Sequence, residues 1–178
     1  MPRVTIGEVR EAFALLYENM HDRDFRKSLR LNEWNEKRLL PLVRMFLLGY
    51  FRHCSPEVQV RLASSSSGWG RIDFRVGDVA VEFAVRRPMD RKGPISSKVN
   101  TTEMIKLMTY DGPALLVLFD FSKHHFATED IERFRDYPSL GRGRFHRSAF
   151  NVAYYYREKK RPRRFLSMCR NIRVVRRS

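Results

Sequence analysis

The chain has 178 residues, 43% of them apolar and 12% aromatic, and its 35 Lys and Arg against 20 Asp and Glu give a net charge of +15. This composition supports one folded domain and excludes wholesale disorder, while the longest apolar run, 39–51, is too short and too charged to span a membrane. Two distant cysteines, Cys54 and Cys169, and an N-terminus without an apolar signal core predict a cytoplasmic protein with no membrane partner.

Hydrophobic periodicity divides the chain into alternating helices and strands. In chain order the patterns predict helices at 5–20 and 32–51, strands at 58–63, 71–76 and 79–86, a helix beginning near 101, a strand at 114–120, a helix beginning at 128 and a strand at 150–156. Asn32 is the expected cap of the second helix. The run at 114–120 is continuously apolar, which is typical of a strand buried on both faces. This order predicts an α/β fold with a central mixed β-sheet flanked by helices.

The last 22 residues are the most basic part of the chain. Residues 157–178 contain ten Lys or Arg and a single acid, so residues 1–156 are interpreted as the domain and 157–178 as a basic extension. The apolar residues Phe165, Leu166 and Ile172 support the other interpretation, in which this segment belongs to the core. The overall charge predicts a nucleic-acid partner. Phosphate contacts are expected from two basic stretches, which contain Arg142, Arg144, Arg147, Lys159, Lys160, Arg161, Arg163 and Arg164.

The candidate chemistry lies on a predicted hairpin. Gly77-Asp78 separates two alternating strands, as in a two-residue hairpin loop, and this register places Asp73 opposite Glu82 on the face away from the apolar partners. Facing carboxylates repel each other unless a cation neutralises them. A Mg²⁺ or Mn²⁺ ion would do so and would support phosphodiester cleavage. Neighbouring arginines that pair with the two acids are the structural alternative.

A third carboxylate is expected from the second helix. Glu36 lies at i, i+4, i+7 and i+11 spacing with Leu40, Val43 and Leu47, which predicts that it lies on the buried seam. A carboxylate there needs a partner, which is a cation, a water held by the metal ion, or an arginine. Glu33 is the neighbouring candidate for the same role.

The order of these acids resembles the PD-(D/E)XK nuclease superfamily. A helical acid precedes Gly70-Arg-Ile-Asp73 on one strand and Glu82 on the next, within residues 32–120. The resemblance implies a restriction-endonuclease-like αβββαβ core in which Asp73 and Glu82 bind the metal ion with the helical acid. Ala84 stands where the family has a lysine.

Three cationic residues are candidates to replace the missing lysine. Arg86 lies one pleat further along the same strand, and Lys98 precedes the next helix. Lys106 lies on that helix, four residues before Tyr110, in a pattern similar to the Gln-x-x-x-Tyr of some relatives.

These features predict a metal-dependent nucleic-acid phosphodiesterase, with DNA as the favoured substrate and RNA as the other. A non-catalytic nucleic-acid-binding protein on the same fold is the first alternative, and Ala84 is the feature that favours it. A basic RNA-associated protein with salt-bridged hairpin acids is the second. The sequence leaves a homodimer open.

Overall fold

The computed structural model describes residues 3–61, 68–91, 93–136, 148–158 and 165–173. Short 3₁₀ turns lie at Leu31–Glu33, Gly93–Ile95 and Arg133–Arg135. The helices and strands are α1 (Ile6–Asn19), α2 (Arg23–Ser28), α3 (Glu36–Phe51), β1 (Ser55–Arg61), β2 (Trp69–Val76), β3 (Val79–Arg86), α4 (Thr101–Thr109), β4 (Ala114–Asp120), α5 (Thr128–Glu132), β5 (Phe150–Arg157) and β6 (Phe165–Ile172). None of the helices in these described ranges is long and apolar enough to cross a bilayer.

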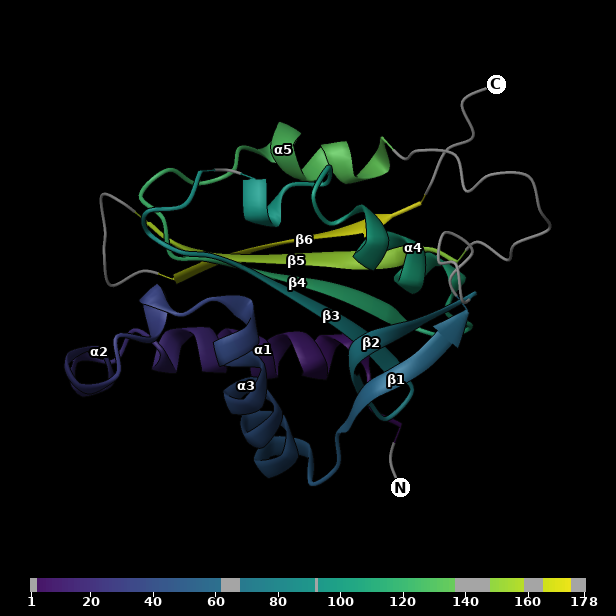
Figure 1. Cartoon of the computed structure of the whole chain (residues 1–178), viewed down its shortest axis with the longest axis horizontal. Coiled ribbons are helices and arrows are strands. Elements are labelled where there is room, and N and C mark those ends of the chain that lie inside the picture. Colours follow the sequence, from purple (N-terminus) through teal and green to yellow (C-terminus); the bar gives the residue numbers. More distant parts are fainter. Residues whose placement is uncertain (1–2, 62–67, 92, 137–147, 159–164, 174–178) are drawn as a thin grey trace.

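The strands form one mixed six-stranded sheet, which confirms the predicted α/β class. Their spatial order follows the chain from β1 to β6. β1, β2 and β3 are antiparallel, β3, β4 and β5 are parallel, and β6 is antiparallel to β5. Helices α1 and α3 cover one face of the sheet, and α4 and α5 lie over the other (Figure 1).

Each face of the sheet has its own hydrophobic core. Alternate residues of β3 point to opposite faces. Val79, Val81, Phe83 and Val85 pack with α1 and α3, whereas Ala80 and Ala84 pack with α4. All seven residues of β4 are buried, as expected for a central strand with a helix layer on either side.

The hairpin between β2 and β3 has the predicted register. Val76 pairs with Val79 and Phe74 with Val81. Gly77 takes a φ of +59°, which a two-residue loop needs at its first position and which glycine adopts without strain.

Two expectations for the first 52 residues need correction. Helix α3 begins at Glu36 with Asn35 as its cap, where the Asn35 side chain accepts a hydrogen bond from the Arg38 N–H. The expected cap, Asn32, lies instead in a 3₁₀ turn. The sequence pattern also did not predict α2, because this helix buries none of its six residues and so shows no apolar periodicity.

The expectation that residues 157–178 lie outside the domain is wrong for residues 165–172. These residues form β6, which pairs with β5 over eight positions, from Phe150 with Ile172 to Arg157 with Phe165. Phe165 also packs against the core on the α1 side, while Ile172 is buried on the α4 side. The apolar residues of this segment therefore belong to the sheet, despite its basic composition.

Candidate active site

The two hairpin acids meet where β2 and β3 separate. The pairs of this ladder end at Phe74 and Val81. Beyond them the Phe83 N–H donates to Asp73 Oδ2 at 2.9 Å, so the Asp73 side chain accepts a bond from the strand backbone. Glu82 is only 1% exposed and faces α4, whereas Asp73 is half-buried. The hairpin therefore brings two carboxylates together at the edge of a buried space.

Helix α4 places a cation against these acids. Lys106 Nζ lies 3.0 Å from Glu82 Oε1, and the Lys106 side chain is 13% exposed. One turn further along, the Tyr110 hydroxyl donates to the Asp78 carbonyl in the hairpin loop at 3.0 Å. The two residues singled out by their spacing thus attach α4 to the hairpin, with the ammonium on the buried acid.

Two more carboxylates adjoin this group. Glu36, the first residue of α3, and Glu103, in the first turn of α4, are both close enough to Asp73 for electrostatic repulsion. We call Glu36, Asp73, Glu82 and Glu103 the carboxylate cluster. Lys106 is the cation that lowers the pKa of three of these acids, Glu36, Asp73 and Glu82.

Burial and mutual repulsion make these acids hard to ionise. Burial first, and the nearby Asp73 second, raise the pKa of Glu82 well above its usual range, although Lys106 opposes the shift. Burial also raises the pKa of Asp73, against the Phe83 N–H and Lys106, which lower it. Desolvation by the surrounding protein, then Asp73 and Glu103, raise the pKa of Glu36 to about 7, although the residue keeps an exposed surface. Added positive charge would therefore stabilise this cluster.

The expectation that Glu36 lies on the buried seam of its helix is wrong. The fully buried residues of α3 are Leu39, Val43 and Leu47, and Glu36 is exposed on its outer side. It reaches the cluster because it starts the helix beside β2, and not because it faces the core. Glu33 is exposed and lines a different hollow.

Two candidate replacements for the missing lysine lie away from the cluster. Arg86 is buried at the end of β3, where its Nε donates to Asp120 Oδ1 at 2.9 Å and its terminal nitrogen contacts Asp120 Oδ2 and the His124 carbonyl. The negative charge of Asp120 holds this guanidinium in a separate buried ion pair. Lys98 is exposed in the turn before α4, and the structure records no contact between its side chain and the acids. Of the three candidates, the structure brings only Lys106 to the acids.

The sequence analysis missed Glu103. Its signal was available, because Glu103 and Lys106 are three residues apart on a helix and so share one face. The basic residues expected to contact phosphate, in the stretches 142–147 and 159–164, lie outside the described residues.

The donor set suits a cation with few protein ligands. Within the described ranges, no three His, Cys, Asp or Glu side chains are arranged to hold a metal ion. Mg²⁺ needs less, because it is usually held by one or two carboxylates and completes its octahedron with water and phosphate oxygens. Asp73 and Glu82 meet that requirement, since the Phe83 N–H occupies only one oxygen of Asp73 and Lys106 only one oxygen of Glu82.

Comparisons of the chain with family models, curated proteins and solved structures gave no match. The mixed six-stranded sheet with flanking helices is consistent with the core order of the superfamily noted above, but a sheet of this kind does not define a family. The carboxylate cluster is therefore the feature of this chain that points to a function.

Proposed function

We propose that the protein is a metal-dependent nuclease, with DNA as its favoured substrate, on a PD-(D/E)XK-like core. The observation that carries this proposal is that Asp73 and Glu82 lie close together and that Lys106 Nζ is 3.0 Å from Glu82 Oε1. Two adjoining carboxylates with raised pKa values are costly to folding and are typical of functional sites.

Asp73 and Glu82 would hold a Mg²⁺ or Mn²⁺ ion. Bound there, the ion supplies Lewis acidity at the scissile phosphate. Lys106 provides the positive charge that the family pattern places at position 84, where this chain has alanine. Only the location of an ammonium group matters for stabilising developing negative charge, so a lysine reaching in from α4 can do this.

Glu36 is suited to accept a proton from water. Its pKa of about 7 places it near the optimum for a general base at neutral pH. It is also the cluster member most open to solvent, so water reaches it directly. In this assignment the two β-strand acids bind the ion, the lysine stabilises charge, and the helical acid handles the proton.

The second candidate function is nucleic-acid binding without cleavage. The ion pair between Lys106 and Glu82 favours it, because a neutralised Glu82 is a weaker metal ligand. Ala84 and the net charge of +15 agree with this alternative. It predicts binding that needs no divalent ion.

A cleavage assay separates the two functions. Wild-type protein is incubated with plasmid and branched DNA in EDTA, Mg²⁺ or Mn²⁺, beside Asp73→Asn and its matched control Asp78→Asn, an exposed aspartate in the same hairpin. We expect cleavage only with a divalent ion, a loss of about 100-fold or more in Asp73→Asn, and normal rates in the control. Wild-type protein that binds both DNAs but cuts neither at millimolar Mn²⁺ would overturn the nuclease proposal.

A further inference from the structure

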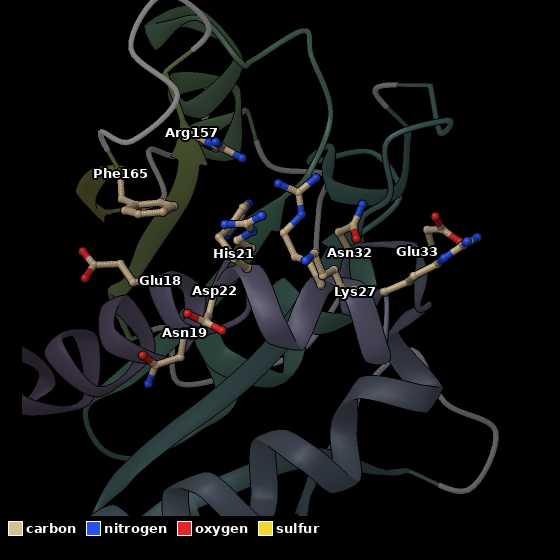
Figure 2. Close-up of a pocket in the computed structure, with 12 residues that line it drawn as sticks. Glu18, Asn19, His21, Asp22, Lys27, Asn32, Glu33, Arg157 and Phe165 are labelled. Atoms are coloured by element: carbon tan, nitrogen blue, oxygen red, sulfur yellow. The ribbon is translucent and has the colours of Figure 1, made fainter.

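A basic groove lies at the outer end of α1 and α2, away from the Lys106–Glu82 pair. It has a volume of about 770 Å³ and runs between these helices and the facing strands β5 and β6. Figure 2 shows Arg157 and Phe165 on one side and His21 and Lys27 on the other. A second hollow of about 520 Å³ adjoins it and shares His21, Arg26 and Arg157 as lining residues. Sites for small molecules have this size.

Five cationic side chains line the groove. Three of them, Arg23, Arg26 and Lys27, follow the i, i+3, i+4 spacing that places residues on one side of a helix, here α2. Arg30 follows the end of this helix and also lines the groove. None of these four forms an ion pair with any residue that the structure describes. Arg157 faces them from β5, and burial together with the nearby Arg26 lowers the pKa of its guanidinium. These like charges converge on a space large enough for an anion.

The acids of the groove do not balance this charge. Glu18, Asp22 and Glu33 also line it, which leaves an excess of two positive charges. Asp22 is already used as the cap of α2, where its Oδ1 accepts the N–H groups of Asp24 and Phe25. A terminal phosphate carries a charge of about −1.5 to −2 at neutral pH, so a positive groove attracts it more strongly than a backbone diester. A backbone diester carries only one negative charge.

Aromatic rings complete the groove. The rings of His21 and Phe165 lie 5.1 Å apart, and Phe165 is only partly buried. His21 bonds the Tyr17 carbonyl through Nδ1 at 2.8 Å, and burial lowers its pKa to about 4, so the imidazole is neutral at pH 7. The two rings are inclined at 55° to each other, so a nucleobase can stack on the face of one of them with the other ring at its edge.

We propose that this groove binds a nucleotide with a terminal phosphomonoester, either free or at the end of a nucleic-acid strand. The phosphate lies among Arg23, Arg26 and Arg157, and the base lies against His21 and Phe165. The site does not depend on the proposed nuclease function, because none of these residues belongs to the carboxylate cluster.

Calorimetry with the full chain in EDTA tests the proposal and removes any contribution from a metal ion. AMP and adenosine are titrated into wild type, Arg26→Gln, Arg23→Gln and the control Arg75→Gln, an exposed arginine on β2. We expect AMP to bind at least tenfold more tightly than adenosine. Each groove variant should lose about tenfold or more in AMP affinity, while the control keeps its affinity. Circular dichroism checks that each variant is folded.

A second pair of ligands, a dinucleotide with and without a 5′-phosphate, shows whether the groove prefers free nucleotides or strand ends. A preference for the phosphorylated dinucleotide over AMP assigns the groove to strand ends, and the reverse preference assigns it to free nucleotides. Equal binding of AMP and adenosine would overturn the proposal. So would an equal loss of AMP affinity in Arg26→Gln and Arg75→Gln, because that result means unspecific attraction to a basic protein.

Discussion

Strand β3 carries two charged side chains on the same face, four residues apart, with very different surroundings. Arg86 at the strand end is 1% exposed and meets one acid, Asp120, which is 0% exposed. Glu82, equally buried, meets one lysine but is repelled by two other acids, Asp73 and Glu103. One region is a balanced pair and the other has an excess of negative charge.

The hydrogen bonds show the same difference. Besides Arg86, Asp120 accepts bonds from the Ser122 N–H at 2.9 Å and the Tyr154 hydroxyl, so its carboxylate is fully partnered. The Tyr154 hydroxyl in turn accepts the Phe126 N–H at 2.9 Å. Such a closed network fixes the ends of β3 and β4 and has no capacity for a ligand. The carboxylate cluster lacks this closure, which is why we assign function there and a structural role to Arg86.

Breaking the Arg86–Asp120 pair should have the largest effect, and it should act on the stability of the fold. Arg86→Ala leaves Asp120 buried and unpaired, and we expect the free energy of unfolding to fall by about 3–5 kcal/mol in denaturant titrations. The control Arg75→Ala, on the exposed side of β2, should change it by less than about 0.5 kcal/mol. A similar small change for both variants would show that the Arg86 pair is not structural.

Removing Lys106, which lies against the carboxylate cluster, should lower the rate of cleavage. Lys106→Ala is expected to lower metal-dependent cleavage by about 100-fold, because the developing charge loses its ammonium, whereas Lys98→Ala should cut normally. Ala84→Lys, which restores the family pattern, should partly rescue Lys106→Ala. Equal rates for Lys106→Ala and wild type would remove Lys106 from the mechanism.

The excess of carboxylates should also appear in the pH dependence of stability. The pKa of Glu36 is about 7 in the folded protein against an ordinary value of 4.5, so the folded state binds the proton more tightly. Stability from this group is therefore complete below about pH 4.5 and is lost as pH rises through 7. Asp73 on β2, Glu82 on β3, and Glu103 with Lys106 on α4 surround the group.

Thermal melts in EDTA measure this dependence. We expect Tm to fall between pH 5 and 8, and to fall less in Glu36→Gln. Glu33→Gln, exposed one turn earlier, is the matched control and should retain the wild-type slope. If Glu36→Gln leaves the dependence of Tm on pH unchanged, the other acids of the carboxylate cluster do not raise the pKa of Glu36.

The smallest expected effect is at Glu103. Glu103→Gln removes one repulsive charge from the cluster, so Tm in EDTA at pH 8 should rise slightly, by the equivalent of about 0.5 kcal/mol. Glu129→Gln, in the first turn of α5 and outside the carboxylate cluster, should not raise it. A fall in Tm for Glu103→Gln would contradict the repulsion.

Local patterns predicted the loop end of the hairpin. The Gly77-Asp78 loop and strict alternation set the register from Val76–Val79 to Phe74–Val81, and Asp73 and Glu82 lie close together just beyond the last of these pairs. Lys106 was one of three candidates, because a sequence gives the face of a helix but not its distance from a strand. The pairing of Arg86 with Asp120 was missed for the same reason, since it joins residues 34 positions apart.

The segments that were missed are those whose composition conceals their structure. β6 lies in the most basic part of the chain, and only its pairing with β5 identifies it as a strand. α2 buries no residue, so it lacks the periodic signal that identified α1 and α3. The side chains of α2 that line the basic groove are cationic, so no apolar spacing in the sequence indicated a helix there.

We expect the carboxylate cluster, and not the Arg86–Asp120 pair, to bind a divalent cation. The decisive measurement is a calorimetric titration of Mn²⁺ into wild type, Glu82→Gln and Asp78→Asn. We predict one binding event in wild type and in Asp78→Asn, and at least a tenfold loss of affinity in Glu82→Gln. Wild-type protein that binds no Mn²⁺ at millimolar concentration, with or without DNA, would contradict the claim.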